Sequence, residues 1–264
     1  MTSASFDSRR LLRKARRLNL FAALDGIYAL FPETRCGRCG VCCYQTPGLF
    51  YIEYLRLFEL VAKLQPEARV AVFHDALRDL LFAWIEPGRS CLFLGEDHRC
   101  CIYDLRPLTC RLFGLTNPAD PEAAQRELHL AAEAEADRLS WLGVEMPDAT
   151  LTRAVVACRR VRSLRGRRPR LDGDDLADQV AGLDRRLLPV EVVEREYCFQ
   201  SFSDRLGAAL FGDETVELLR LQLLRRAQRG EPVESLVAEV AQGLRWPQLT
   251  TTHHRRPPCP SASE

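Results

Sequence analysis

Closely and regularly spaced cysteines are the residues of this chain best suited to chemistry. The first group is a C-x2-C-x2-C-C run made of Cys36, Cys39, Cys42 and Cys43. Each two-residue spacer allows a tight turn that directs neighbouring sulfurs toward one point. Gly37 and Gly40 follow the first two cysteines, where a chain that wraps an ion often needs positive φ. Because thiolate is a preferred ligand of zinc and of iron–sulfur clusters, the run predicts a metal site.

Further thiols downstream extend the predicted ligand set to seven with Cys91, Cys100 and Cys110. Adjacent residues project about 100° apart on a helix and to opposite faces on a strand, so we do not expect Cys42 and Cys43 to bind one mononuclear ion together. Seven thiols also exceed the four that one zinc ion or one 4Fe–4S cluster takes. We therefore expect two metal centres, or one multi-iron cluster beside spare thiols. The remote Cys110 after a C-x2-C-x2-C run favours iron–sulfur over zinc.

The same residues resemble a known family. Cys39-Gly40-Val41-Cys42-Cys43, then Cys91 to Leu94, then Cys100 to Phe113 follow the pattern C-G-x-C-C, C-x-x-L and C-x-I-Y-x-x-R-P-x-x-C-R-x-F. This pattern is typical of the bacterial CxxCxxCC family of zinc- or iron-chelating domains. The resemblance covers about residues 33–114. It implies a metal site, and for most members it implies no known reaction.

Departures from the family pattern and neighbours of the thiols refine the prediction. Cys101 fills a variable position, so it is an extra thiol outside the predicted ligand set. Arg106 and Arg111 flank Cys110; the motif match supports them as counter-charges for a centre of net charge near −2, and Tyr103 could donate a hydrogen bond to sulfur. Within the same resemblance, the flagellin lysine N-methylase carries a similar cysteine cluster. Methyl transfer is therefore an alternative, although no glycine-rich adenosylmethionine loop is visible.

Composition indicates a reducing compartment and a globular protein. The chain has 264 residues, and its eleven cysteines are too few for a disulfide-stapled scaffold of this length. No segment reaches the roughly 20 apolar residues of a membrane span, and the basic N-terminus is expected to form an amphipathic helix, so we expect a cytoplasmic protein. Net charge is +1, so neither membrane nor nucleic acid is an expected partner. The arginine-rich run over 153–170 is expected to be a solvated helix end and loop. The partner or substrate, a protein or a small molecule, is left open.

Apolar periodicity predicts a mostly α fold with little or no β structure: a cysteine-rich metal-binding N-terminal region followed by a helical bundle. Pairing of 91–94 with 101–103 would be the only strand pair. The predicted divisions are 1–118 for the N-terminal helix and cysteine region, 119–249 for the helical region, and 250–264 for a disordered tail. The predicted helices span residues 5–30, 51–64, 67–86, 121–142, 149–165, 174–187, 190–210, 213–229 and 232–245.

These observations favour a cytoplasmic metal-binding protein whose cysteine cluster chelates iron, as iron–sulfur, or zinc. If it is an enzyme, the reaction belongs at the metal, because no other reactive constellation is visible. The alternatives are a structural zinc module with a helical partner-binding surface, metal delivery or storage, and a protein-lysine methyltransferase-like enzyme. Cys158 is expected to be a small buried hydrophobe, and His98 is a further candidate ligand.

Overall fold

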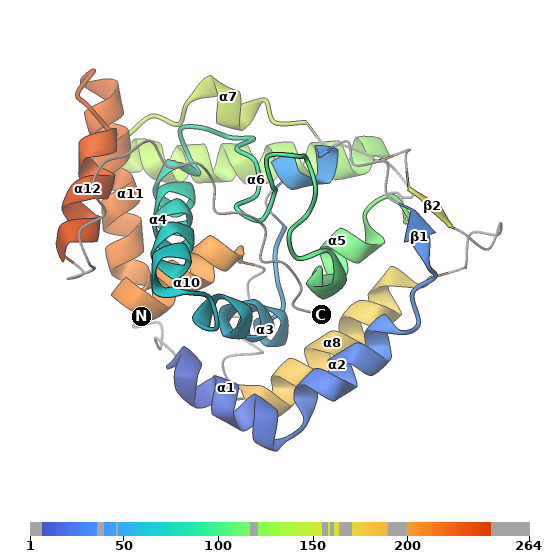
Figure 1. The fold of residues 1–264 in the computed structure, drawn as a ribbon. Coiled ribbons are helices and arrows are strands. Elements are labelled where there is room, and N and C mark those ends of the chain that lie inside the picture. The colour runs from blue at the N-terminus through green and yellow to red at the C-terminus, as the bar shows by residue number, and fades with distance from the viewer. Residues whose placement is uncertain are drawn as a thin grey trace.

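The structure is a computed structural model, and it confirms the mostly helical fold (Figure 1). It describes residues 7–35, 40–45, 47–116, 121–154, 158, 161–163, 171–189 and 200–243. The predicted tail over 250–264 therefore lies outside the described residues, as does most of the arginine-rich run. No helix of the described part is long and apolar enough to cross a membrane.

The elements follow one another in this order: α1 (Ser8–Arg17), α2 (Leu20–Tyr28), β1 (Thr34–Arg35), η1 (Val41–Tyr44), α3 (Tyr51–Ala62), α4 (Pro66–Phe82), η2 (Tyr103–Leu105), α5 (Leu108–Leu112), α6 (Pro121–Trp141), α7 (Asp148–Leu151), β2 (Arg162–Ser163), α8 (Gly173–Leu187), α10 (Phe202–Phe211), α11 (Asp213–Gln228) and α12 (Glu234–Gly243). Here η marks a 3-10 helix. Most predicted helices are confirmed, with ends that differ by a few residues.

Four predicted elements are wrong in part. Residues 190–199 of the helix predicted over 190–210 lie outside the described residues, and α10 begins only at Phe202. The helix predicted over 5–30 breaks at Asn19, which adopts a left-handed conformation (φ 53°) that asparagine tolerates better than most residues. The helix predicted over 149–165 ends at Leu151, and residues 162–163 instead pair with β1 in antiparallel register. The predicted strand pair around Cys91 is reduced to one bridge between Leu94 and Cys100.

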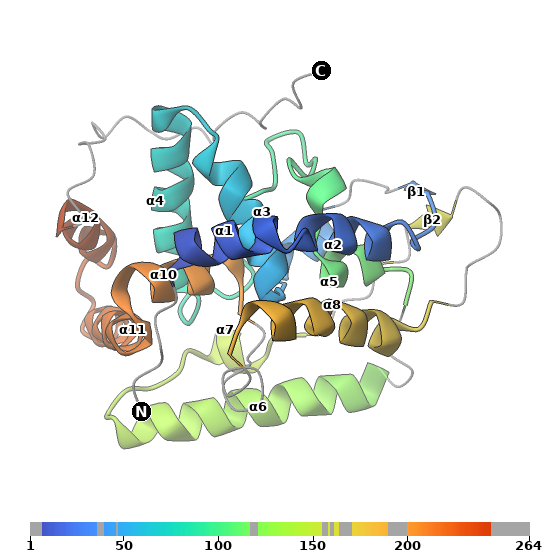
Figure 2. The ribbon, with the colours of Figure 1, turned by 90° about the horizontal axis from the view of Figure 1, so that it is seen from below.

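The main core joins segments that are far apart in the sequence. It contains buried side chains of α1, α2, α3 and α8, together with Leu108 of α5 and Phe202 of α10. Figure 2 shows α8 running beside α2 at this core. The predicted boundary near residue 118 stays a prediction, but helices after it pack directly on the cysteine-containing region.

Smaller clusters attach the remaining helices. Leu77, Leu80 and Leu81 of α4 pack with buried residues of α11 and α12. Leu139 of α6 packs with Leu221 and Leu224 of α11. The helices α11 and α12 thus lie at one end of the molecule, beside α4 (Figures 1 and 2).

Two buried carboxylates hold the N-terminus of α3, where unpaired backbone N–H groups need acceptors. Asp184 of α8 accepts from the N–H groups of Tyr51 (2.6 Å) and Ile52 (2.8 Å). Glu53 accepts from the N–H of Phe50 (2.9 Å). Because Asp184 lies 132 residues along the chain from Ile52, this contact fixes α8 against α3.

Close contact between α4 and α10 yields a first testable prediction. A Cβ added at Gly207 would lie 2.4 Å from Leu80 Cδ2 and 3.3 Å from Val216 Cγ2, and Leu80 is itself buried. Gly207→Ala should lower the free energy of unfolding by about 1–3 kcal/mol, because overpacking forces neighbouring side chains apart. Chemical denaturation measures this change.

Gly182→Ala in α8 is the matched control. A Cβ at Gly182 meets nothing within 4 Å, so alanine there should be neutral or should stabilise the helix by up to about 1 kcal/mol. Equal stability of the two variants would contradict the close packing of α4 on α10.

Candidate metal centre

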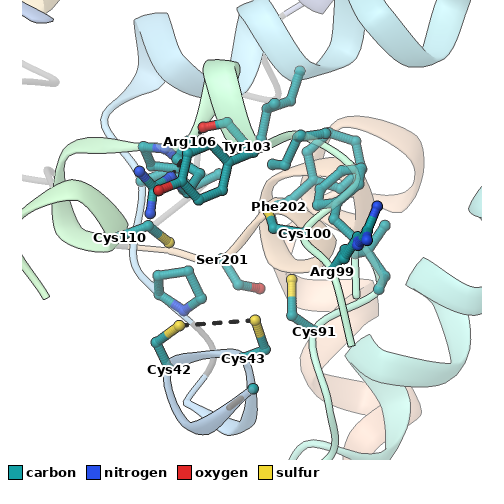
Figure 3. Close-up of a pocket in the computed structure, with 18 of the residues that line it drawn as sticks. Cys42, Cys43, Cys91, Arg99, Cys100, Tyr103, Arg106, Cys110, Ser201 and Phe202 are labelled. Atoms are coloured by element: carbon teal, nitrogen blue, oxygen red, sulfur yellow. Dashed lines mark hydrogen bonds between the residues drawn. The ribbon is translucent and has the colours of Figure 1, made fainter. Parts of the chain in front are cut away.

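Cys42 and Cys43 lie together on the short helix η1. Gly40 precedes it with φ 68°, a left-handed conformation that glycine adopts without penalty, and the N–H of Cys43 donates to the Gly40 carbonyl (2.7 Å). The two sulfur atoms lie 3.8 Å apart (Figure 3). Two thiolates bound tetrahedrally to one zinc ion at ~2.3 Å would be separated by ~3.8 Å. The tight backbone of this turn brings both sulfurs to one side, unlike on a regular helix or strand, so their geometry allows a shared ion; the expectation that they do not share one stays a prediction.

Cys91 is joined to this turn by the backbone. Its N–H donates to the carbonyl of Cys43 (2.5 Å), which connects segments separated by 47 intervening residues. The loop that follows is closed by the bridge between Leu94 and Cys100 and by the N–H of Cys101, which donates to the Phe93 carbonyl (2.9 Å). The loop therefore returns Cys100 to the neighbourhood of Cys91.

Cys110 is positioned by α5, and α5 is positioned by Glu53. The Glu53 carboxylate accepts from the Leu108 N–H at the start of α5 (2.6 Å) and from the hydroxyl of Tyr28. It is 2% exposed, and burial raises its pKa to about 7, although the Tyr28, Leu108 and Phe50 donors act in the opposite direction. One carboxylate thus connects α2, α3 and the helix that carries Cys110.

Five of the seven predicted ligands line one cavity of about 690 Å³: Cys42, Cys43, Cys91, Cys100 and Cys110. None of the five is in a disulfide. Figure 3 shows their labelled sulfurs around this space. Cys42 and Cys43 come from η1, Cys91 and Cys100 from the loop that follows α4, and Cys110 from α5. The other two, Cys36 and Cys39, lie outside the described residues. The structure brings the five together, and their role as ligands stays a prediction.

The remaining candidate ligands differ in placement. Cys101 is held in a disulfide, so it offers no thiolate while that bond persists. His98 lines the cavity and adopts φ 58°. Cys158 is buried, as expected, but lies away from the cavity and is not helical.

The two arginines near Cys110 have different surroundings. Arg106 lines the cavity, stacks on the Tyr103 ring with its guanidinium carbon 3.6 Å from the ring centre, and donates through Nε to the Tyr103 carbonyl (2.9 Å). Arg111 does not line it; it donates to the carbonyls of Arg106 (2.8 Å) and Asp104 and covers the Tyr28 ring. Arg106 is therefore placed to balance charge in the cavity, whereas Arg111 supports the loop. Tyr103 also lines the cavity, and its hydroxyl donates to the Thr34 carbonyl (3.4 Å).

Residues of α4 and α10 complete the cavity, and the sequence prediction missed them. Asp79, Ser201, Phe202 and Ser203 all line it. The predicted helix over 190–210 ran through Ser201, although Ser201 caps α10 and exchanges hydrogen bonds with Asp204. The pattern Ser-x-x-Asp was the available signal, since it is a variant of the capping box that marks a helix start.

Electrostatics inside the cavity depend on burial and on the crowding of thiols. Burial, followed by the neighbouring Cys100, raises the pKa of Cys91 to about 12, and burial likewise raises the pKa of Cys110. The hydrogen bond from Cys43 and the charge of Arg106 hold the pKa of Cys42 below its ordinary value. Most of these thiols thus stay protonated until a cation offsets their repulsion, so metal binding would release protons.

The donor set fits a thiophilic metal or cluster. Five thiols face one space, and the Cys42–Cys43 separation equals that of two ligands on one tetrahedral ion. Within the described residues, no three cysteine, histidine or acidic side chains are already gathered closely enough to hold an ion.

Comparison with known proteins agrees with the chemistry of the site. Residues 35–154 match the model of the family CxxCxxCC, described as "Putative zinc- or iron-chelating domain". The match confirms the resemblance and extends it beyond the motif to the end of α7. No curated protein matches, and no solved structure matches. Similarity to the flagellin lysine N-methylase is thus not shown.

The raised pKa of Glu53 predicts a specific pH dependence of stability. A carboxyl group whose pKa rises from 4.5 to about 7 on folding binds its proton more tightly in the folded protein. The protonated group contributes about 3 kcal/mol to the free energy of unfolding. This contribution is fully present below about pH 4.5 and is lost as the pH rises to about 7. Glu53→Gln should remove this dependence, although it also lowers stability because the amide nitrogen cannot accept.

Urea unfolding at about pH 5 and at about pH 7.5 measures the effect as a difference between variant and wild type. Glu67→Gln, which changes an exposed carboxylate of α4, is the control and should follow the wild-type dependence. An unchanged pH dependence in Glu53→Gln would show that Glu53 does not titrate in this window.

Proposed function

Since residues 35–154 match a family described as chelating zinc or iron, we propose that this is a cytoplasmic protein whose cysteine cluster binds an iron–sulfur cluster. The observation that carries the proposal is the set of five thiols that line one cavity. Cysteine thiolates supply the protein ligands of common iron–sulfur clusters. Five thiols exceed the four that either one zinc ion or one 4Fe–4S cluster takes, so iron–sulfur is favoured by the remote Cys110 after the C-x2-C-x2-C run and not by the number of thiols.

Each neighbouring group has a role in this proposal. The thiolates would hold the cluster, which supplies electron transfer or Lewis acidity when bound. Arg106 would balance part of the net negative charge, because its terminal amino groups make no hydrogen bond to the described part of the chain. Apolar residues such as Leu49, Leu57 and Ile102 line the same cavity and would limit access of water.

A structural zinc site is the second candidate, favoured by the 3.8 Å separation of the Cys42 and Cys43 sulfurs. In that case four thiolates would close around the ion and leave no open position for a reaction. The cavity beside the thiols argues for the first candidate, since a purely structural site needs no such space.

Anaerobic purification and reconstitution separate the two candidates. An iron–sulfur protein should be brown, with broad absorption near about 400 nm from sulfur-to-iron charge transfer, and it should contain iron and sulfide. Cys91→Ser and Cys110→Ser should each lower metal affinity by more than about 100-fold, because each removes a ligand. Metal analysis and visible spectra provide both readouts.

Cys158→Ser is the matched control, because this thiol is buried but lies away from the cavity; it should retain the metal. Colourless protein with stoichiometric zinc would defeat the iron assignment and leave the structural zinc site. Full metal content in Cys91→Ser and in Cys110→Ser would contradict both candidate functions.

Metal removal should loosen the thiol-bearing segments first. A bound metal would join three segments: η1, the loop that follows α4, and α5. It would contribute folding free energy to these segments, because an unfolded chain has no preformed site. Hydrogen exchange should therefore show a larger loss of protection over residues 40–45 and 91–112 than in α11 and α12. Equal loss in both regions, or none, would indicate that the metal does not join these segments.

A further inference from the structure

The thiol-lined cavity is larger than a metal site requires. Its volume of about 690 Å³ falls within the range of about 300–1,000 Å³ typical of small-molecule pockets. Metal–thiolate bonds are only about 2.3 Å long, so a centre held by the thiols leaves much of the space open. The lining beyond the thiols therefore indicates what else can bind.

One part of that lining carries a carboxylate that forms no ion pair with the described part of the chain. Asp79 of α4 accepts a hydrogen bond at Oδ2 from the Ser203 hydroxyl (2.7 Å). Its Oδ1 makes no hydrogen bond to the described part of the chain, and burial holds the pKa of Asp79 above its ordinary value. The carboxylate is thus fixed at one oxygen and available at the other.

The two arginines whose charges act on Asp79 are paired with other carboxylates. Arg220 pairs with Asp204 and donates to the Leu80 carbonyl (2.8 Å). Arg89 pairs with Glu86 (2.6 Å). Their charges lower the pKa of Asp79, but neither forms an ion pair with it, so direct contact with the carboxylate is open to a cation from outside the chain.

The balance of charge in the cavity also favours a cation. Four thiolates around zinc, or around a 4Fe–4S cluster, leave a net charge of about −2. Asp79 adds a negative charge that the charges of Arg89 and Arg220 offset in part, Arg106 offsets another, and Arg99 is paired with Asp97 (3.0 Å). An anionic ligand would be repelled.

Aromatic side chains supply a surface for an apolar body. Phe93 and Phe202 both line the cavity, with their ring centres 5.3 Å apart in an edge-to-face arrangement. Figure 3 shows Phe202 beside Cys100 on the wall of the cavity. Aromatic faces also attract ammonium groups, by about 0.5–2 kcal/mol.

We propose that the cavity binds a small organic amine next to the metal centre, with its ammonium group on Asp79 and Ser203 and its apolar body against Phe93 and Phe202. The inference rests on the proposed function, because it uses the negative charge of the proposed metal centre. The position of the cationic group rests on Asp79 and Ser203 and not on the metal, so it can be tested separately.

Calorimetric titration of the metal-loaded protein tests the proposal with phenethylamine, hexylamine and cadaverine as probes. Phenylacetate and phenethyl alcohol are the anionic and neutral comparisons. At least one amine should bind, at least about tenfold more tightly than both comparisons. Asp79→Asn should weaken that amine at least about tenfold, because a charge-assisted hydrogen bond is lost while the contact with Ser203 is kept.

Asp137→Asn, at an exposed position of α6, is the control and should bind as the wild type does. Metal content is measured in every sample. No binding by any amine, equal binding in Asp79→Asn, or tighter binding of phenylacetate would overturn the inference while the metal result stands. Protein that takes up no metal would instead defeat the proposed function, and the Asp79 comparison would still decide the amine site.

Discussion

The buried carboxylate of Glu53 is the contact on which the site most depends. It accepts from the backbone of Phe50 and Leu108 and from the Tyr28 hydroxyl, so it connects the start of α3, the start of α5 and the end of α2. Asp184 adds a second buried acceptor from α8 at the same helix end. A buried carboxylate is costly unless its oxygens are bonded, and three donors meet that requirement here. The position of Cys110 follows from this arrangement.

Around that frame, the backbone brings thiols from distant segments into one space. The hydrogen bond from Cys91 to Cys43 joins η1 to the loop after α4, and the bridge at Cys100 closes the loop. Crowded, buried thiols resist ionisation, as the raised pKa values of Cys91 and Cys110 indicate. A bound cation would lower these pKa values, because it stabilises the thiolate form. Because thiolate is a soft ligand, these cysteines would favour a thiophilic metal once a cation displaces their protons.

The sequence predicts the helical fold well, because helices depend on local spacing, whereas the grouping of the five described cysteines is expected from the family pattern that spans Cys39 to Phe113. It fails where distant contacts decide. The chain after Leu151 leaves the helix to pair with β1, and Asn19 breaks a continuous apolar pattern. Asp79 and Ser203 are placed on the cavity only by the packing of α4 on α10, which no motif encodes. Arg111 matches the family motif beside Cys110, yet it points to backbone carbonyls and not to the cavity.

The central claim is that thiols from separate segments bind one metal centre in this cavity. X-ray absorption at the metal edge of the loaded protein tests it most directly. The account predicts a first shell made of sulfur, at about 2.3 Å from the metal. The sulfur count should fall in Cys91→Ser and stay constant in Cys158→Ser. A shell dominated by nitrogen or oxygen at about 2.0–2.2 Å, or one unchanged in Cys91→Ser, would contradict the account.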